Sequence, residues 1–379
     1  MQGKNFKLVL DTFCEVYDLL KPWADDHFWD LTRHDLVPGA VYLIGRQQMV
    51  ANAPLVREMA ESGNFVIVHS NPAEGSETLR NKCYSYGIDQ LVLDRKILLL
   101  SGGEMAPEWP YMLFDSFLPK VLDYEENIQA IDQAQAIFTK TNKPYKFLFL
   151  NGRMRPSRKY LVEQFDLTGV LDQSLWSLLD GHSNTRGVLK LMHQDQDLMK
   201  TSRPVKYLDP AYEVDAYSAN VDQPVQESYV KPALFNNDWG EIYLKAAPYV
   251  DTYFSVVTET VFDYPYSFRT EKIWKPIAMG HPWIAVANEG YYRDMRNLGF
   301  RTFESVIDES FDLIPNSQDR IQRIAQVVDD LCRQDLVSFL KECYNTCKYN
   351  QQHLADMRVR VRKEFPNRFY QFIQQHLHD

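Results

Sequence analysis

Short apolar runs alternate with amphipathic stretches along the first 140 residues. The runs have the length and composition of buried strands and occur at residues 40–45, 65–69 and 96–103. Between them, apolar residues at helical spacing predict helices at residues 54–61 and 77–86. Strands that alternate with helices in this way are typical of βαβ units and a parallel sheet. The first 35 residues are amphipathic and aromatic, and we expect helix and loop that cover an edge of this sheet.

The alternation starts again at Lys146, after a linker predicted at residues 141–144. Buried strands are predicted at residues 147–150, 254–257 and 283–287. Helices are predicted at residues 156–165, 271–279, 291–298, 317–331 and 334–378. We therefore predict an α/β fold with two domains, residues 1–140 and 141–335, and a C-terminal helical segment, residues 336–379.

The segment from Phe254 to Asn288 carries the strongest candidate chemistry. Its first strand leads into Glu259, and an aromatic loop then leads to Arg269 and Thr270. Thr270 is a suitable N-cap, because its hydroxyl can accept from backbone N–H groups that have no partner inside the helix. The next two residues, Glu271 and Lys272, then fall in the first helical turn, at the sheet edge where open α/β folds bind ligands.

A lysine in the first turn opposes the helix dipole. An anion bound there would resolve the conflict, since it could take the Lys272 ammonium and the free backbone N–H groups together. Glu271 could accept hydrogen bonds from the vicinal hydroxyls of a ribose. The alternative is a solvated helix end that carries one acid and one base.

A second candidate loop follows the strand at residues 147–150. It has the sequence Asn-Gly-Arg-Met-Arg-Pro, residues 151–156, and leads into a helix that begins with proline. Arg153 and Arg155 on a strand-to-helix loop, with a glycine that lets the backbone approach closely, suit a diphosphate. The alternative is a surface loop with two solvated arginines.

These segments resemble those of a known enzyme family. Glu259, the loop with Asp263-Tyr264, and then Thr270-Glu271-Lys272-Ile273-Trp274 resemble the donor-binding segment of fucosyltransferase-like glycosyltransferases. Thr260 replaces the asparagine that is usual in that family, and the loop before Glu271 is a couple of residues longer. Residues 151–156 and 298–312 resemble the branch of such enzymes found in phages and bacteria. The resemblance covers about 75 residues in two blocks, chiefly 146–159 and 254–312.

The resemblance implies a fold and a set of roles. It implies two facing Rossmann-like domains, the GT-B arrangement, with a final helix that crosses back to the first domain. Glu271 and Lys272 would contact the ribose and diphosphate of a sugar nucleotide, and Glu259 would orient donor hydroxyls. Arg153, Arg155 and Lys272 would neutralise the leaving diphosphate in place of a metal, with help from Arg269.

In that arrangement a catalytic base comes from the first domain. Glu104, just past the predicted strand at 96–103, could take the proton of an attacking hydroxyl, with inversion at the sugar carbon. His69 occupies the equivalent place one strand earlier, and Asp94, which precedes its strand, ranks below both. Each of these could equally be an ordinary structural side chain.

Composition and charge narrow the class of protein. The chain has 379 residues, of which 45% are hydrophobic, and no apolar run of the length needed to span a bilayer. We expect a cytoplasmic protein without a signal peptide, and five cysteines without CxxC spacing favour a reduced chain without structural zinc. Asp195-Gln196-Asp197 matches a metal-binding DxD, but its apolar neighbours favour a solvated helix face, and no cofactor or metal is expected.

The acceptor stays open at this stage. The formal net charge is −10, yet residues 140–206 carry twelve Lys or Arg against six Asp or Glu, which indicates a local anion site. The acceptor is either a glycan or a hydroxymethylated base in phage DNA, which would have to be flipped out of the duplex. The alternative function is a catalytically inactive protein that binds a sugar nucleotide or a glycan.

Overall fold

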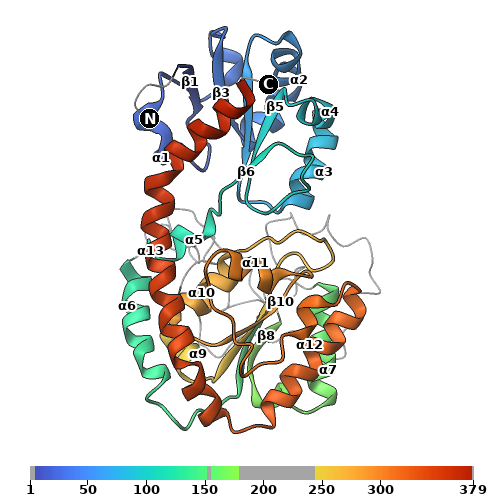
Figure 1. Ribbon diagram of the computed structural model, residues 1–379, viewed down its shortest axis with the longest axis vertical. Helices are drawn as coiled ribbons and strands as arrows, with labels where there is room; N and C mark the ends of the chain where they lie inside the picture. Colours follow the sequence, from blue (N-terminus) through green and yellow to red (C-terminus); the bar gives the residue numbers. More distant parts are fainter. Residues whose placement is uncertain (1–4, 124, 152–154, 179–243, 378–379) are drawn as a thin grey trace, which may run out of the picture. The chain divides into compact units, whose positions relative to one another are not determined.

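The computed structural model describes residues 5–123, 125–151, 155–178 and 244–377. The chain forms two compact units (Figure 1): unit 1 comprises residues 1–119, 266–269 and 356–379, and unit 2 comprises residues 120–265 and 270–355. The chain passes from one unit to the other after Pro119, Pro265, Arg269 and Ala355. Each unit is built on one parallel sheet.

These boundaries differ from the predicted one at residue 140. The segment predicted as a linker, residues 141–144, is held inside unit 2. There the Tyr253 hydroxyl donates a hydrogen bond to the carbonyl of Thr141 at 2.9 Å, and Lys143 is buried. Lys143 can be buried there because the aliphatic stem of a lysine packs readily against apolar neighbours.

Unit 1 contains six parallel strands in the order β2-β1-β3-β4-β5-β6. They are β1 (Lys7–Asp11), β2 (Asp26–Phe28), β3 (Ala40–Gly45), β4 (Val66–Asn71), β5 (Ile97–Ser101) and β6 (Tyr111–Leu113). The helices are α1 (Tyr17–Leu20), α2 (Arg46–Ser62), α3 (Ser76–Tyr86), α4 (Asp89–Leu93) and the C-terminal part of α13 (Leu336–Leu377), with 3₁₀ turns η1 (Lys21–Trp23) and η2 (Leu31–Arg33). Helix α5 (Phe117–Val121) includes the first boundary between the units.

Alternate residues of the strands in unit 1 point to opposite faces of the sheet, and both faces are covered. One face packs against α2, α3 and α4, through residues such as Tyr42, Ile67 and Leu99. The other face packs against α1 and the end of α13, through Leu8, Leu10, Val41, Val68, Leu98, Phe365 and Phe369 among others. A sheet buried on both faces explains why its strands are almost continuously apolar.

The expectation for the first 35 residues was wrong. They contribute two strands of the sheet, and β1 is an interior strand between β2 and β3. Only three consecutive apolar residues, Leu8-Val9-Leu10, mark β1 in the sequence, and β2 is three residues long. Runs this short carry little periodicity, so pairing with β3 decides the conformation rather than local preference.

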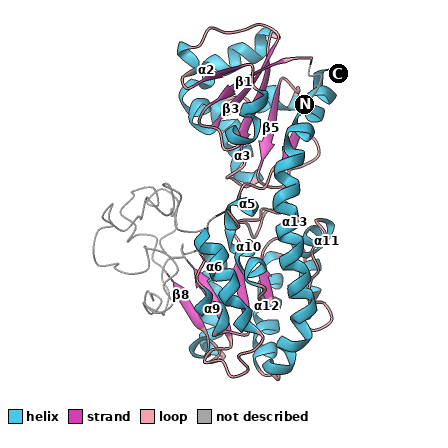
Figure 2. Ribbon diagram, turned by 90° about the vertical axis from the view of Figure 1, so that its left-hand side faces the viewer, coloured by secondary structure: helices cyan, strands magenta, loops and turns pink. Residues whose placement is uncertain are grey.

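Unit 2 contains four parallel strands in the order β10-β9-β7-β8, drawn as magenta arrows in Figure 2. They are β7 (Phe147–Asn151), β8 (Leu175–Leu178), β9 (Phe254–Thr258) and β10 (Trp283–Val286). The helices are α6 (Glu125–Gln133), α7 (Pro156–Leu167), α9 (Ala246–Val250), α10 (Glu271–Met279), α11 (Tyr291–Asn297), α12 (Ser317–Cys332) and the first part of α13. Shorter 3₁₀ turns are η3 (Ala134–Ile137), η4 (Leu171–Gln173) and η10 (Ser310–Leu313).

The chain is thus a mixed α/β protein with two parallel sheets, as the alternating pattern predicted. In unit 2, helices α7 and α12 lie side by side, and α10 contacts β9 and β10 (Figure 1). All four strands end at one edge of the sheet, because parallel strands share a direction. The residues at that edge form the candidate site.

Candidate functional site

Glu259 organises the carboxyl edge of the sheet in unit 2. It follows β9 directly and is buried. Its Oε2 accepts a hydrogen bond from the Thr270 hydroxyl at 2.7 Å, and its Oε1 accepts from the Thr270 N–H at 3.2 Å and from the Tyr291 hydroxyl at 3.1 Å. One carboxylate therefore connects the end of β9 to the first residues of both α10 and α11.

Thr270 is the N-cap of α10, as predicted. Its hydroxyl accepts from the Lys272 N–H at 3.4 Å, and also from the Lys272 ammonium at 3.1 Å. The ammonium also donates to Glu271 Oε1 at 2.6 Å. In this structure the conflict between Lys272 and the helix dipole is therefore offset by two neighbouring oxygens, Thr270 Oγ1 and Glu271 Oε1.

The two carboxyl groups at this edge differ in acidity. Burial raises the pKa of Glu259 above its ordinary value, and the nearby Lys272 ammonium and the bonds from Thr270 only partly oppose this effect. Burial alone would also raise the pKa of Glu271, but the ammonium groups of Lys272 and Lys275 lower it below the ordinary value. Glu271 therefore stays ionised, and an ionised carboxylate is a good acceptor of hydrogen bonds from hydroxyl groups. It lies beside the partly exposed ammonium of Lys272.

A second network ties β7 to β9 at the same edge. Asn151, the last residue of β7, accepts a hydrogen bond from the Thr258 hydroxyl at 2.9 Å, and its N–H donates to Ser177 Oγ at 3.3 Å. Arg158 of α7 is buried and donates from Nε to Thr258 Oγ1 and from Nη2 to the Thr258 carbonyl, both at 3.0 Å. The ends of the two central strands are therefore fixed by side chains as well as by the sheet.

Part of the predicted diphosphate loop lies outside the described residues. Arg153 is outside the described residues. Arg155 is the N-cap residue of α7, with extended backbone and Pro156 at the first helical position, so it stands just past the carboxyl end of β7. Arg155 is therefore on the same sheet edge as Lys272, as parallel topology requires.

Arg269 has different partners from those predicted. It belongs to unit 1, and its side chain is only 1% exposed. The guanidinium donates from Nη2 to Glu104 Oε1 at 2.6 Å, and its Nε lies 3.9 Å from Asp115 Oδ2. A buried guanidinium requires carboxylates nearby, and here two carboxylates of unit 1 supply them.

Glu104, the predicted base, is thus held in an ion pair. Its backbone N–H also donates to the Ser267 carbonyl at 3.1 Å, and Gly103 forms an isolated bridge with Phe268. Gly103 is needed there, because a Cβ would stand 2.7 Å from the Ser267 carbonyl oxygen. Among the described residues the second carboxylate oxygen of Glu104, Oε2, has no hydrogen-bond partner.

The two other candidate bases are placed less favourably for contact with a ligand. His69 is completely buried in unit 1, where its Nδ1 lies 3.3 Å from the Ile44 carbonyl. Burial lowers the pKa of His69 to about 4, so the imidazole is neutral near pH 7. Asp94 is exposed at the end of α4 and accepts a hydrogen bond from Gln90 at 2.8 Å.

The aromatic residues near these loops serve the core more than a surface. Tyr291 and Tyr292 are buried, and their hydroxyls bond to Glu259 and to the Ala285 N–H, respectively. Phe268 is buried in unit 1 against Phe117. In the described conformation these three rings are therefore not accessible for stacking on a base or a sugar.

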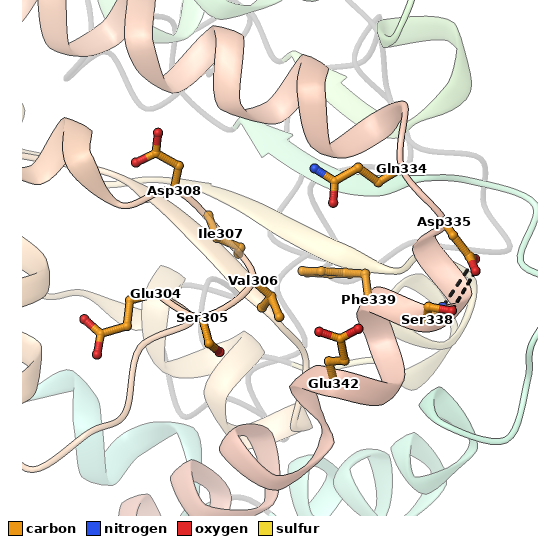
Figure 3. Close-up of a pocket in the computed structure, with 10 residues that line it drawn as sticks. All are labelled: Glu304, Ser305, Val306, Ile307, Asp308, Gln334, Asp335, Ser338, Phe339 and Glu342. Atoms are coloured by element: carbon orange, nitrogen blue, oxygen red, sulfur yellow. Dashed lines mark hydrogen bonds between the residues drawn. The ribbon is translucent and has the colours of Figure 1, made fainter.

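A cavity of about 660 Å³ opens elsewhere in unit 2, between the loop at residues 304–308 and the start of α13 (Figure 3). Its lining includes four carboxylates, Glu304, Asp308, Asp335 and Glu342, and no lysine or arginine. Asp335 caps α13 through Ser338, and Asp308 forms an ion pair with Arg323. Carboxylates without a lining cation repel a diphosphate, so we do not assign the donor to this cavity.

Neither a metal-binding cluster nor a membrane-spanning helix is present among the described residues. Within them no group of three or more His, Cys, Asp or Glu side chains is arranged to hold a metal ion. The Asp195-Gln196-Asp197 motif lies outside the described residues. None of the helices that the structure describes has the length and apolar character to cross a bilayer.

Arg158 was missed in the sequence. It occupies the apolar face of α7, at helical spacing from Leu161, Val162 and Phe165, and all four side chains are buried. An arginine that interrupts an apolar stripe signals a buried, fully bonded guanidinium, and that signal was available.

A comparison of the chain with protein-family models, with curated proteins and with solved structures found no match.

Proposed function

We propose that the protein is a metal-independent glycosyltransferase that takes its nucleotide-sugar donor at the carboxyl edge of the sheet in unit 2. The observation that carries the proposal is the network of Glu259, Thr270, Glu271 and Lys272. It joins a helix N-terminus, a partly exposed ammonium and an acidic carboxylate at the edge where open α/β sheets bind ligands.

Each member of this network has a distinct role in the proposal. The Lys272 ammonium exchanges its bond to Glu271 for an oxygen of the diphosphate, a group that carries two negative charges against the one of a carboxylate. The Glu271 carboxylate is then free to accept the ribose hydroxyls. Glu259 fixes Thr270, and with it the direction of α10, so that the first-turn N–H groups face the anion.

Positive charge then stabilises the leaving nucleoside diphosphate. Lys272 lies in the first turn of α10 and Arg155 at the N-cap of α7, both at the carboxyl edge of the sheet, and Arg153 belongs to the same predicted loop as Arg155. Fixed cations aimed at developing negative charge lower the barrier without reorganisation, and this effect replaces a bound metal. We extend the proposal to the GT-B arrangement, in which Glu104 of unit 1 accepts the proton of the acceptor hydroxyl with inversion at the sugar carbon.

A thermal-shift screen with nucleoside diphosphates and sugar nucleotides tests the donor site. A ligand that binds only the folded protein raises its melting temperature. At least one nucleotide should do so, and Lys272→Ala should weaken its binding by about tenfold to a hundredfold, as expected for a hydrogen bond to a charged group. The matched control is Lys341→Ala, which removes an exposed lysine from the same unit.

Two measurements distinguish binding of the donor from catalysis of its reaction. A nucleotide response that is equal in wild type and Lys272→Ala removes Lys272 from the site. Release of free sugar from the bound donor in the absence of acceptor distinguishes an enzyme from a protein that only binds nucleotides. No response to any nucleotide would remove the basis of the proposal.

A further inference from the structure

A second cavity of unit 2, of about 350 Å³, lies between helices α7 and α12, which run side by side (Figure 1). Most of the residues that line it carry hydrogen-bonding side chains, namely Tyr160, Gln164 and Thr168 from α7, and Gln322, Gln326 and Asp329 from α12. The volume is at the lower end of the range for small-molecule sites, and such sites often lie between packed helices.

The polar lining follows the geometry of the two helices. The three residues from α7 are four positions apart, so they form one row along that helix. Those from α12 are four and three positions apart and form a second row. Polar rows normally face open water, but these two rows line one cavity from neighbouring helices.

Two apolar residues, Phe165 of α7 and Ala325 of α12, complete the lining, and both are buried. Ala325 helps to keep the cavity open, because its side chain ends at Cβ and a longer one would fill the space. Phe165 provides an apolar surface on which the C–H face of a ligand can pack. The cavity therefore combines an apolar surface with several hydrogen-bonding groups, as ligand pockets do.

The charge of the lining is compensated. Asp329 is the one ionisable acid or base that lines the cavity, apart from the Tyr160 hydroxyl, and its Oδ2 pairs with Arg333 one turn further along α12. The guanidinium offsets the carboxylate, so the cavity presents little net charge and favours a neutral ligand over an ion of either sign. The other oxygen, Asp329 Oδ1, has no hydrogen-bond partner among the described residues and can accept one.

Hydroxyl groups match this lining. A glutamine amide both donates and accepts, and so does a tyrosine or threonine hydroxyl. Burial raises the pKa of Tyr160, so its hydroxyl stays protonated. Neighbouring hydroxyls of a sugar ring also donate and accept, and the ring has an apolar C–H face. A sugar therefore uses the amides, the hydroxyls and the apolar surface together.

We propose that the cavity between α7 and α12 binds a neutral sugar. The sugar hydroxyls would bond to the glutamine amides and to Asp329, and a C–H face would pack on Phe165. The cavity is separate from the proposed donor site, since Gln164 lies nine residues beyond Arg155, about 14 Å along α7. The inference therefore does not depend on nucleotide binding by unit 2.

Saturation-transfer difference NMR of the full-length protein with D-glucose, D-galactose and N-acetyl-D-glucosamine tests the site. At least one sugar should bind with a Kd of about 1 mM, the strength expected of so small a ligand. Gln322→Ala and Asp329→Ala should each weaken binding about threefold to tenfold, since each removes a hydrogen-bonding group. The matched controls are Gln318→Ala and Asp330→Ala, which change exposed residues of α12 outside the cavity and should bind like wild type.

Several results would overturn the proposal. They are binding of none of the three sugars, equal binding by wild type and both lining variants, or equal losses in the lining variants and their controls. Binding of adenosine or spermidine that the lining variants lose, without sugar binding, would also overturn it and assign the cavity to another ligand. The melting temperature of each variant without ligand checks that it is folded.

The same variants separate this cavity from the donor site. Lys272→Ala should bind the sugar like wild type, because it leaves the cavity intact. Gln322→Ala and Asp329→Ala should keep any thermal shift that nucleotides produce. A failure of one site is therefore recognised without reference to the other.

Discussion

The Thr270 hydroxyl donates to Glu259 Oε2 at 2.7 Å while it accepts from the backbone N–H and the ammonium of Lys272. Thr270 thus passes the position of the buried carboxylate on to the first turn of α10. The geometry of the candidate donor site is therefore fixed by Glu259, a buried residue that a bound ligand need not touch.

Glu259→Ala should destabilise the protein strongly. The change leaves the Thr270 N–H and the Tyr291 hydroxyl without their buried acceptor, and each unsatisfied donor costs about 1–3 kcal/mol. We expect the free energy of unfolding in urea to fall by roughly 2–4 kcal/mol. Tyr291→Phe, which removes one of the donors instead, should cost about 1 kcal/mol. A similar loss in both variants would contradict the central role of the carboxylate.

Glu309 should make stability fall as the pH rises from about 4.5 to 7. Burial raises the pKa of Glu309 from 4.5 to about 7, although Arg296 donates to it at 2.9 Å and the Phe303 N–H at 2.6 Å. Because the folded pKa is the higher one, the folded state binds the proton more tightly, and this stability is lost through that pH range.

The size of the effect follows from the same shift. A displacement of about 2.5 pKa units corresponds to roughly 3 kcal/mol between pH 4.5 and pH 7. Urea unfolding of wild type and Glu309→Gln at several pH values measures it, and the difference between the two should change across this interval. Glu304→Gln, an exposed neighbour, is the control and should follow wild type. A constant difference between Glu309→Gln and wild type would show that Glu309 keeps an ordinary pKa.

The ion pair of Arg269 and Glu104 should couple strongly in a double-mutant cycle. Arg269 is buried, so removal of the Glu104 carboxylate leaves a poorly compensated charge, whereas removal of both partners does not. We expect a coupling of about 3 kcal/mol between Arg269→Met and Glu104→Gln in urea unfolding. The exposed pair of Lys21 and Asp18 should show a much weaker coupling in the same experiment, because solvent screens both charges.

The five cysteines should not react with a thiol reagent in the folded protein. All are free and buried, and burial raises the pKa of each thiol, for Cys83 and Cys332 to about 12. The thiolate is the reactive form, so native protein should show no rapid labelling, and denatured protein should show five equivalents. Rapid labelling of any cysteine in the native protein would reveal local opening at that position.

The sequence predicted the long, strongly patterned elements well. Strands such as β3, with six consecutive buried residues, and helix α3 were predicted with nearly correct bounds. Thr270 was recognised as an N-cap because capping depends on local chemistry. β1, β2, β6 and β8 were missed, since they are short and owe their conformation to pairing with distant strands.

The side-chain partners at the site were harder to predict. Neither the bond from Tyr291 to Glu259 nor the pairing of Arg269 with Glu104 is local, since 32 and 165 residues separate the partners. Arg269 and Thr270 are adjacent in sequence yet belong to different units. Sequence proximity therefore grouped Arg269 with Lys272, and only the tertiary fold separates their roles.

Strand β1 and the end of helix α13 meet in one core cluster of unit 1. Leu8 and Leu10 of β1 pack in one cluster with Phe365, Phe369 and Ile373, near the end of the chain. During synthesis on a ribosome, β1 emerges long before α13, and this face of the sheet stays uncovered until the end of α13 has left the exit tunnel. Unit 1 can therefore mature only after α13 has been made, and a nascent chain that lacks α13 presents its apolar surface to chaperones and proteases.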